Sequence, residues 1–229
     1  MEGTSFFSLP REIRDQIYEL CLVSTATFQP LERSQRGLAV HLLRASTAVH
    51  AEACAVLYGQ NRFEFVDPVR PRVLDAFLAR IGAAAAAHLR HVLIPFPRLA
   101  SVSPGPGATT LNPNDVALAA SLRRRCPRLR TLSTEYLSTF VMLGSEVARL
   151  EPPLRREVLA LLDAHFRSVG PSLRHIIVRL HEEDVFHLGA GRTEEIESRG
   201  WAVCTDDDDD DVRPGDGRRV AQQFTTHTQ

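Results

Sequence analysis

The sequence predicts an α/β fold in which N-terminal helices precede a short series of helix–strand units with parallel strands. Three similar segments carry this prediction: LRHV (89–92), LRTL (129–132) and LRHI (173–176), spaced 40 and then 44 residues apart. Each follows a segment with helical periodicity and continues into a stretch typical of a β-strand. A helix that links two such strands makes them parallel, with a right-handed crossover.

The N-terminal segment FFSLPREIRDQIYELCLV (6–23) predicts an amphipathic helix. Pro10 suits the first helical position, and Glu12 lies in the first turn, where the helix dipole favours a carboxylate. Apolar residues then recur at helical spacing and form one stripe. The stripe consists of Ile13, Ile17, Leu20 and Cys21.

A polar segment (24–37) predicts a loop, and HLLRASTAVHAEACAVLYG (41–59) predicts a second helix. Gly59 is expected to cap its C-terminal end. The alternation in NRFEF (61–65) predicts a short strand. The shared apolar face of the second helix consists of Leu42, Val49, Ala53, Val56 and Leu57.

The helix–strand units follow from residue 67 onward. The predicted helices are RVLDAFLARIG (72–82), DVALAASLRRRCP (115–127) and REVLALLDAHFRSVG (156–170), and the strands after them are HVLIPF (91–96), TLSTEY (131–136) and HIIVRL (175–180). EEIESRGWAVC (194–204) is a weaker fourth copy. Stacked units of this kind are similar to leucine-rich repeats, although their spacing is longer. Leu89, Leu129 and Leu173 would then mark the strand entrances. An ordinary small α/β sandwich uses the same elements and is the alternative.

Two segments predict irregular structure. SVSPGPGATTLNPND (101–115) is rich in proline and glycine and predicts a loop. The C-terminal segment 205–229 contains six consecutive aspartates (206–211) and no apolar periodicity. Like charges repel, so we expect a disordered acidic and polar tail.

The amino-acid composition argues against several classes of function. All 27 basic residues are arginine, and the formal net charge of −1 argues against a non-specific nucleic-acid or membrane-surface binder. The four cysteines form no CxxC pair, so we expect no zinc site. We also expect no signal peptide and no membrane span, which indicates a cytoplasmic or nuclear protein.

No segment carries a convincing catalytic pattern. In HEEDVFH (181–187) the histidines stand at i and i+6, whereas a zinc-protease helix needs i and i+4, so we expect a strand-end loop with solvated charges. GAGR (189–192) predicts a turn into the next helix, and RRRCPRLR (123–130) predicts a solvated helix end. His50, His165 and His175 are expected to be structural or exposed at the surface. We therefore expect no enzyme, no cofactor and no metal.

Parts of the first 66 residues resemble the F-box-like domain found in filamentous-fungal proteins. That domain carries a Leu-Pro-x-Glu-Ile-x-x-x-Ile-Tyr helix, a second helix with Leu-Leu, Glu-Ala and Leu-Tyr pairs, and a closing Asn-x-Phe. The matching residues of the first part are Leu9, Pro10, Glu12, Ile13, Ile17 and Tyr18. Those of the second part are Leu42, Leu43, Glu52, Ala53, Leu57, Tyr58, Asn61, Phe63 and Phe65. The match covers a little over a quarter of the chain.

The resemblance implies a binding function for the first helix. In an F-box, the Leu-Pro helix docks on the Skp-type adaptor of a cullin–RING ubiquitin ligase, as an apolar helical face does in a groove. The residues that would bind the adaptor are Leu9, Pro10, Ile13 and Ile17. The alternative is that the same stripe packs on the helix at 41–59 and on the repeat layer, because one apolar stripe does not show which surface it buries.

The resemblance and the residue patterns together predict three parts: an F-box-like domain (1–66), implied by the resemblance, an α/β repeat domain (67–204) and the tail (205–229). The expected function is protein–protein interaction, with the chain as a substrate receptor that links an unknown client protein to a Skp–cullin-type ubiquitin ligase. One alternative is an F-box-like scaffold that does not bind the adaptor. Another is a metal-dependent enzyme that uses the segment 181–187.

Overall fold

A five-stranded parallel sheet with the order β1-β2-β5-β6-β7 is the centre of the computed structural model, which describes residues 5–30, 38–65, 71–105 and 107–205. The strands are β1 (Arg62–Glu64), β2 (His91–Ile94), β5 (Thr131–Thr134), β6 (His175–Arg179) and β7 (Trp201–Cys204). The prediction of an α/β fold with parallel strands is confirmed. The tail expected at 205–229 lies, apart from Thr205, outside the described residues.

The three similar segments of the sequence lie side by side in the sheet. His91 pairs with Thr131, and Thr131 pairs with His175, so the copies are in register. Trp201 of the weaker fourth copy pairs with Ile176. Because strand order follows chain order and such crossovers are right-handed, the connecting helices lie on one face of the sheet. One buried row of side chains crosses all five strands: Phe63, Val92, Leu132, Ile176 and Trp201.

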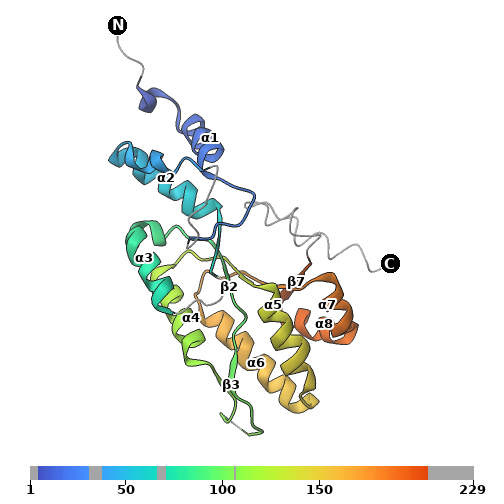
Figure 1. Ribbon diagram of the computed structural model, residues 1–229. Coiled ribbons are helices and arrows are strands. Elements are labelled where there is room, and N and C mark those ends of the chain that lie inside the picture. Colours follow the sequence, from blue (N-terminus) through green and yellow to red (C-terminus); the bar gives the residue numbers. More distant parts are fainter. Residues whose placement is uncertain (1–4, 31–37, 66–70, 106, 206–229) are drawn as a thin grey trace.

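Side chains of the helices between the strands complete the core, and Figure 1 shows how these helices are arranged around the sheet. They are α3 (Pro71–Ala86), α4 (Pro113–Arg125), α5 (Tyr136–Thr139), the π-helical η3 (Phe140–Glu146), the 3-10 helix η4 (Val147–Arg149), α6 (Pro152–Ser168), α7 (Glu182–Leu188) and α8 (Ala190–Glu197). Phe166 of α6 makes edge-to-face contacts with Phe96 and Trp201, at centroid distances of 5.5 and 5.1 Å. The predicted helices at 72–82, 115–127 and 156–170 are thus confirmed.

Two segments expected to be loops carry regular structure. Within 101–115, Thr110–Leu111 forms β4 and pairs antiparallel with β3 (Leu99–Ser101), and α4 begins at Pro113. The hydroxyls of Ser101 and Thr110 lie 2.7 Å apart and hold this pair together. The segment HEEDVFH is the helix α7, because three carboxylates in its first turn favour a helix N-terminus. Gly189, at φ 79°, turns the chain from α7 into α8, as predicted.

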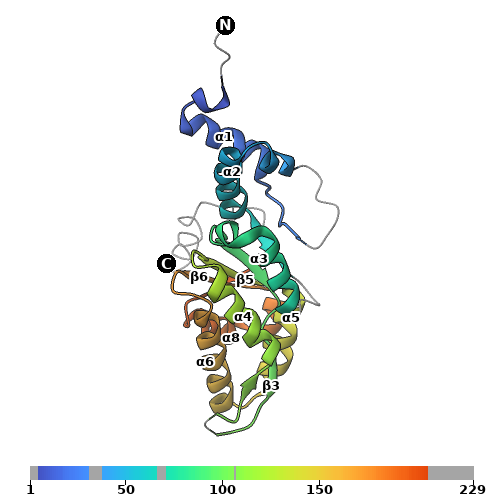
Figure 2. The ribbon, with the colours of Figure 1, turned by 90° about the vertical axis from the view of Figure 1, so that its left-hand side faces the viewer.

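Four helical segments precede the sheet: η1 (Phe6–Ser8), α1 (Arg11–Leu22), η2 (Val40–Arg44) and α2 (Thr47–Gln60). The expected single helix at 41–59 is therefore two, because the Ser46 hydroxyl accepts a hydrogen bond from the Val49 amide and caps α2. Gly59 does not cap this helix, which continues to Gln60. In both views α1 and α2 project from one end of the molecule (Figures 1 and 2). Within the described ranges, no helix combines the length and apolar character needed to cross a membrane.

The junction between these helices and the sheet is continuous. β1 belongs to the same sheet as the later strands, although it lies in the segment 1–66. Phe28, from the segment after α1, adds to the edge of β1 through hydrogen bonds with Arg62 and Glu64. Tyr58 packs against the cores of both parts, and burial raises the pKa of its hydroxyl to about 12.

Asn61 joins the C-terminal ends of α1 and α2. Its side chain is fully buried, and its amide nitrogen donates to the carbonyls of Leu22 and Leu57 at 2.7 and 2.8 Å. Its amide oxygen accepts from the backbone of Ser24 at 2.8 Å. These bonds satisfy groups that the two helix ends leave without intrahelical partners.

We expect Asn61→Ala to destabilise the contact between α1 and α2 by about 2 kcal/mol, because two carbonyls and one amide lose their buried partner. Hydrogen exchange of the α1 amides should then accelerate roughly 30-fold. Gln60→Ala is the control, since that side chain makes an exposed hydrogen bond to Glu19. Equal exchange rates in the two variants would contradict the role assigned to Asn61.

Candidate functional site

The first helix packs on α2 mainly through a different face from its predicted apolar stripe, although Cys21 of that stripe packs against the core of the helix pair. Tyr18 and Leu22 are fully buried between the helices, and Arg14 lies on the same face. This face is displaced by one residue, or about 100° around the helix, from the stripe that begins at Ile13. The buried core of the helix pair consists of Tyr18, Leu22, Val49, Ala53, Val56 and Leu57.

The four residues predicted to bind an adaptor therefore lie on the outer side of the helix pair. Leu9 is 36% exposed and Ile13 is 41% exposed; Pro10 is exposed as well, and Ile17 is half-buried. Within α1, the spacing of Ile13 and Ile17 places them along one edge of the helix, whereas Leu9 and Pro10 precede the helix in extended backbone. Leu20, at 87% exposure, extends the same edge and belongs to the stripe predicted from the sequence. We call Leu9, Pro10, Ile13, Ile17 and Leu20 the outer stripe.

A polar cluster fixes this orientation of α1. The Glu52 carboxylate accepts hydrogen bonds from Arg14 at 2.7 and 2.9 Å and from Arg11 at 3.0 Å. The Tyr18 hydroxyl donates to the same carboxylate at 3.2 Å. The hydrogen bonds from Arg14, and then the positive charges of Arg11 and Arg14, outweigh burial and lower the pKa of Glu52. Rotating α1 to bury the outer stripe would break all of these bonds.

The lowered pKa of Glu52 makes the docking of α1 sensitive to acid. The stabilisation is fully present above the unfolded-state value of 4.5 and is lost as the pH falls through the lower folded-state value. We expect hydrogen-exchange protection of α1, after correction for the intrinsic rate, to fall in that range for the wild type.

In Glu52→Gln this acid-dependent loss should be smaller, and protection should already be reduced at neutral pH. Glu157→Gln is the control, because Glu157 is exposed on α6, outside α1, and forms no ion pair within the described residues. If the hydrogen-exchange protection of α1 fell with pH in Glu52→Gln as it does in the wild type, groups other than Glu52 would control the docking of α1.

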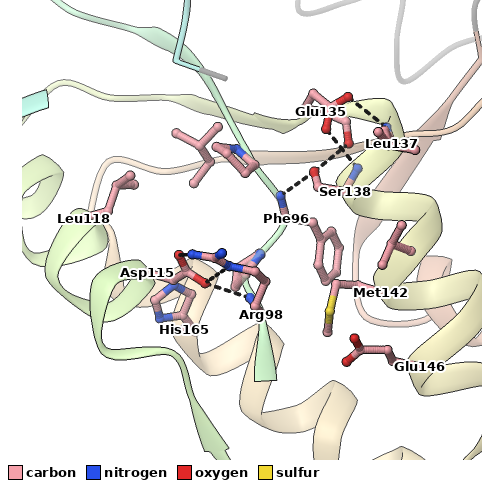
Figure 3. A pocket seen from close by; sticks show the side chains of 14 residues that line it. Phe96, Arg98, Asp115, Leu118, Glu135, Leu137, Ser138, Met142, Glu146 and His165 are labelled. Carbon is pink, nitrogen blue, oxygen red and sulfur yellow. Dashed lines mark hydrogen bonds and ion pairs between the residues drawn. The ribbon is translucent and has the colours of Figure 1, made fainter. Parts of the chain in front are cut away.

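A second candidate site lies at the C-terminal ends of β2 and β5, where parallel sheets commonly bind ligands. There the chain forms a pocket of about 260 Å³ between the segment 94–98, the start of α5 and the helices α4 and α6. Its walls are largely apolar (Figure 3). Apolar lining residues include Pro97, Leu118, Leu137, Val141 and Met142. We call it the β2–β5 pocket.

Most charged groups of the β2–β5 pocket are held in place by hydrogen bonds. Asp115, in the first turn of α4, accepts from the backbone of Arg98 at 2.8 Å and from its guanidinium at 3.3 Å. Glu135 caps α5 by accepting from the amides of Leu137 and Ser138, both at 2.8 Å. Glu146 forms no hydrogen bond or ion pair with a described residue and is exposed at the pocket.

His165 of α6 also lines the β2–β5 pocket, beside Asp115 (Figure 3). The residue is only 8% exposed, and its ring nitrogens form no hydrogen bond with a described residue, although they are not fully buried. Burial lowers the pKa of the imidazole, so the ring is neutral at pH 7, although Asp115 acts in the opposite direction. From the sequence, His165 was expected to be structural or exposed at the surface, and no pocket was predicted there. The sequence feature that could have revealed the pocket is the position of Pro97 and Glu135, just after two parallel strands.

The other motifs of the sequence analysis do not assemble into a site. His181 occupies the N-cap position of α7 and stacks on Tyr136 with ring centroids 4.6 Å apart, whereas His187 lies in the last turn of that helix. Among the described residues, no group of three or more histidine, cysteine or acidic side chains is placed to hold a metal ion. Arg124 and Arg125 end α4 and contact Asp75 of α3 at 3.6 Å.

Comparisons with protein-family models, with curated proteins and with solved structures found no match for this chain.

Proposed function

We propose that this chain is an F-box-like substrate receptor that binds a Skp-type adaptor through its N-terminal helices and holds a client protein with its sheet domain. The observation that carries the proposal is the outward orientation of the outer stripe. Leu9, Ile13 and Leu20 stay exposed although the helix buries Tyr18 and Leu22 completely. Exposed apolar side chains gathered on one helix edge favour binding to a groove in a partner protein.

The adaptor is the partner that fits the resemblance of residues 1–66 to F-box-like domains. The residues that match that family divide into two sets. Tyr18, Glu52 and Asn61 hold the helix pair together, whereas Leu9, Pro10 and Ile13 lie on its outer side. A family pattern with both sets is expected of a small helical domain that binds a partner. One set stabilises the fold, and the other contacts the partner.

The mechanism would be proximity. The receptor would bring its client near a ligase whose chemistry lies in other subunits, so this chain would act without catalytic groups of its own. Such a receptor would work in the cytoplasm or the nucleus. We expect the sheet domain to bind the client, because the N-terminal helices project away from it and would be occupied by the adaptor.

A second candidate is an F-box-like scaffold that does not bind the adaptor. The completely buried Tyr18 and Leu22 favour it, because the helix pair already has a closed core without a partner. The two functions differ in whether the outer stripe is covered in the cell.

The first test is a pull-down of the purified chain with a fungal Skp-type adaptor. We expect the wild type to bind and the double variant Leu9→Asp, Ile13→Asp to bind at least tenfold more weakly, because each change places a charge in an apolar contact. Both side chains are exposed, so circular dichroism of the variant should match the wild type.

Phe186→Asp is the matched control, because Phe186 is 85% exposed on α7, in the other part of the molecule. It should leave adaptor binding unchanged. A folded wild type that does not bind the adaptor would reject the receptor and favour the scaffold. The same would follow if the double variant bound as tightly as the wild type.

A further inference from the structure

The size of the β2–β5 pocket limits what it can hold. Pockets for cofactors and drug-sized ligands have volumes of about 300–1,000 Å³. The β2–β5 pocket, at about 260 Å³, is slightly smaller and opens to solvent beside the exposed Glu146. It is therefore large enough for one long side chain or a fragment of similar size.

The charged side chains that line the β2–β5 pocket favour one sign of charge on its ligand. Three carboxylates line it, from Asp115, Glu135 and Glu146, against the single guanidinium of Arg98. Arg98 is already paired with Asp115. An anionic ligand would meet an excess of negative charge, whereas a cation would find the unpaired carboxylate of Glu146.

His165 adds a polar contact for the ligand. Its ring nitrogens form no hydrogen bond with a described residue and are not fully buried, so they are available to a molecule in the pocket. A neutral imidazole has one nitrogen that accepts and one that donates. Among the described residues, none donates a hydrogen bond to the accepting nitrogen, which can therefore accept from an N–H group of a ligand. A ligand with several N–H groups on a flat head would satisfy both His165 and the carboxylates.

We propose that the β2–β5 pocket binds the side chain of an arginine in an extended segment of a client polypeptide. The aliphatic stem of that arginine would lie against Leu137 and Met142, and its guanidinium would donate to His165 and Glu146. The assignment of the ligand to a client polypeptide rests on the proposed receptor function. The selection of a guanidinium rests only on the pocket.

The test uses the full-length chain without any adaptor, so its outcome is separate from the pull-down. Isothermal titration calorimetry would compare N-acetyl-arginine N-methylamide with the corresponding leucine, lysine and glutamate derivatives. We expect the arginine probe to bind with a dissociation constant on the order of 1 mM, as a ligand of this size allows. The lysine probe should bind more weakly, and the leucine and glutamate probes should not bind.

Two variants locate the binding. Glu146→Gln should weaken binding of the arginine probe about threefold, because it removes an exposed charge. His165→Leu should weaken it about tenfold, because it removes a hydrogen bond to a charged group. Fluorescence of Trp201 verifies the fold of His165→Leu, since this ring packs on the neighbouring Phe166. Glu157→Gln is the control, an exposed carboxylate of α6 outside the pocket.

Three results would overturn the proposal. The first is an arginine probe that binds no better than the leucine probe. The second is unchanged affinity in both Glu146→Gln and His165→Leu. The third is n-butylguanidine that binds while the arginine probe does not, because the pocket would then admit only a small free cation and not the side chain of a polypeptide. The last result would leave the receptor function untouched and remove only its link to this pocket.

Discussion

The parallel pairing of successive strands in register is the constraint on which the rest of the molecule depends. Each helix–strand unit places its strand beside the previous one, with His91, Thr131 and His175 at equivalent positions. This order puts the helices on one face and brings all strand C-termini to one edge. The segments that leave β2 and β5 therefore meet there, and the pocket between them follows from the pairing.

A polar cluster has a similar controlling role in the N-terminal helices. Hydrophobic burial has no direction, and it could turn either the outer stripe or the face with Tyr18 and Leu22 toward α2. Hydrogen bonds are directional, and the four that reach Glu52 select the second face. Asn61 then fixes the ends of both helices. The exposure of Leu9 and Ile13 is thus a consequence of where the polar residues lie.

The two candidate surfaces are built on different principles and lie in different parts of the fold. The outer stripe is apolar and convex, on a helix pair that projects from one end of the molecule (Figures 1 and 2). The β2–β5 pocket is concave and acidic, at the edge of the sheet. An apolar helix edge suits a large protein partner, whereas a small acidic pocket suits one side chain. A receptor that binds an adaptor and a client at the same time needs such a separation.

The sequence by itself determined the α/β class, the parallel strands and the three main crossover helices, because hydrophobic periodicity and the repeated LR segments are local signals. It did not determine the break at Ser46, the β3–β4 pair or the helix α7, where capping and pairing hydrogen bonds compete with composition. Only the tertiary structure decided which face of α1 is buried and that His165 meets Asp115 in a pocket. Both depend on contacts between residues far apart in the chain, which no local pattern encodes.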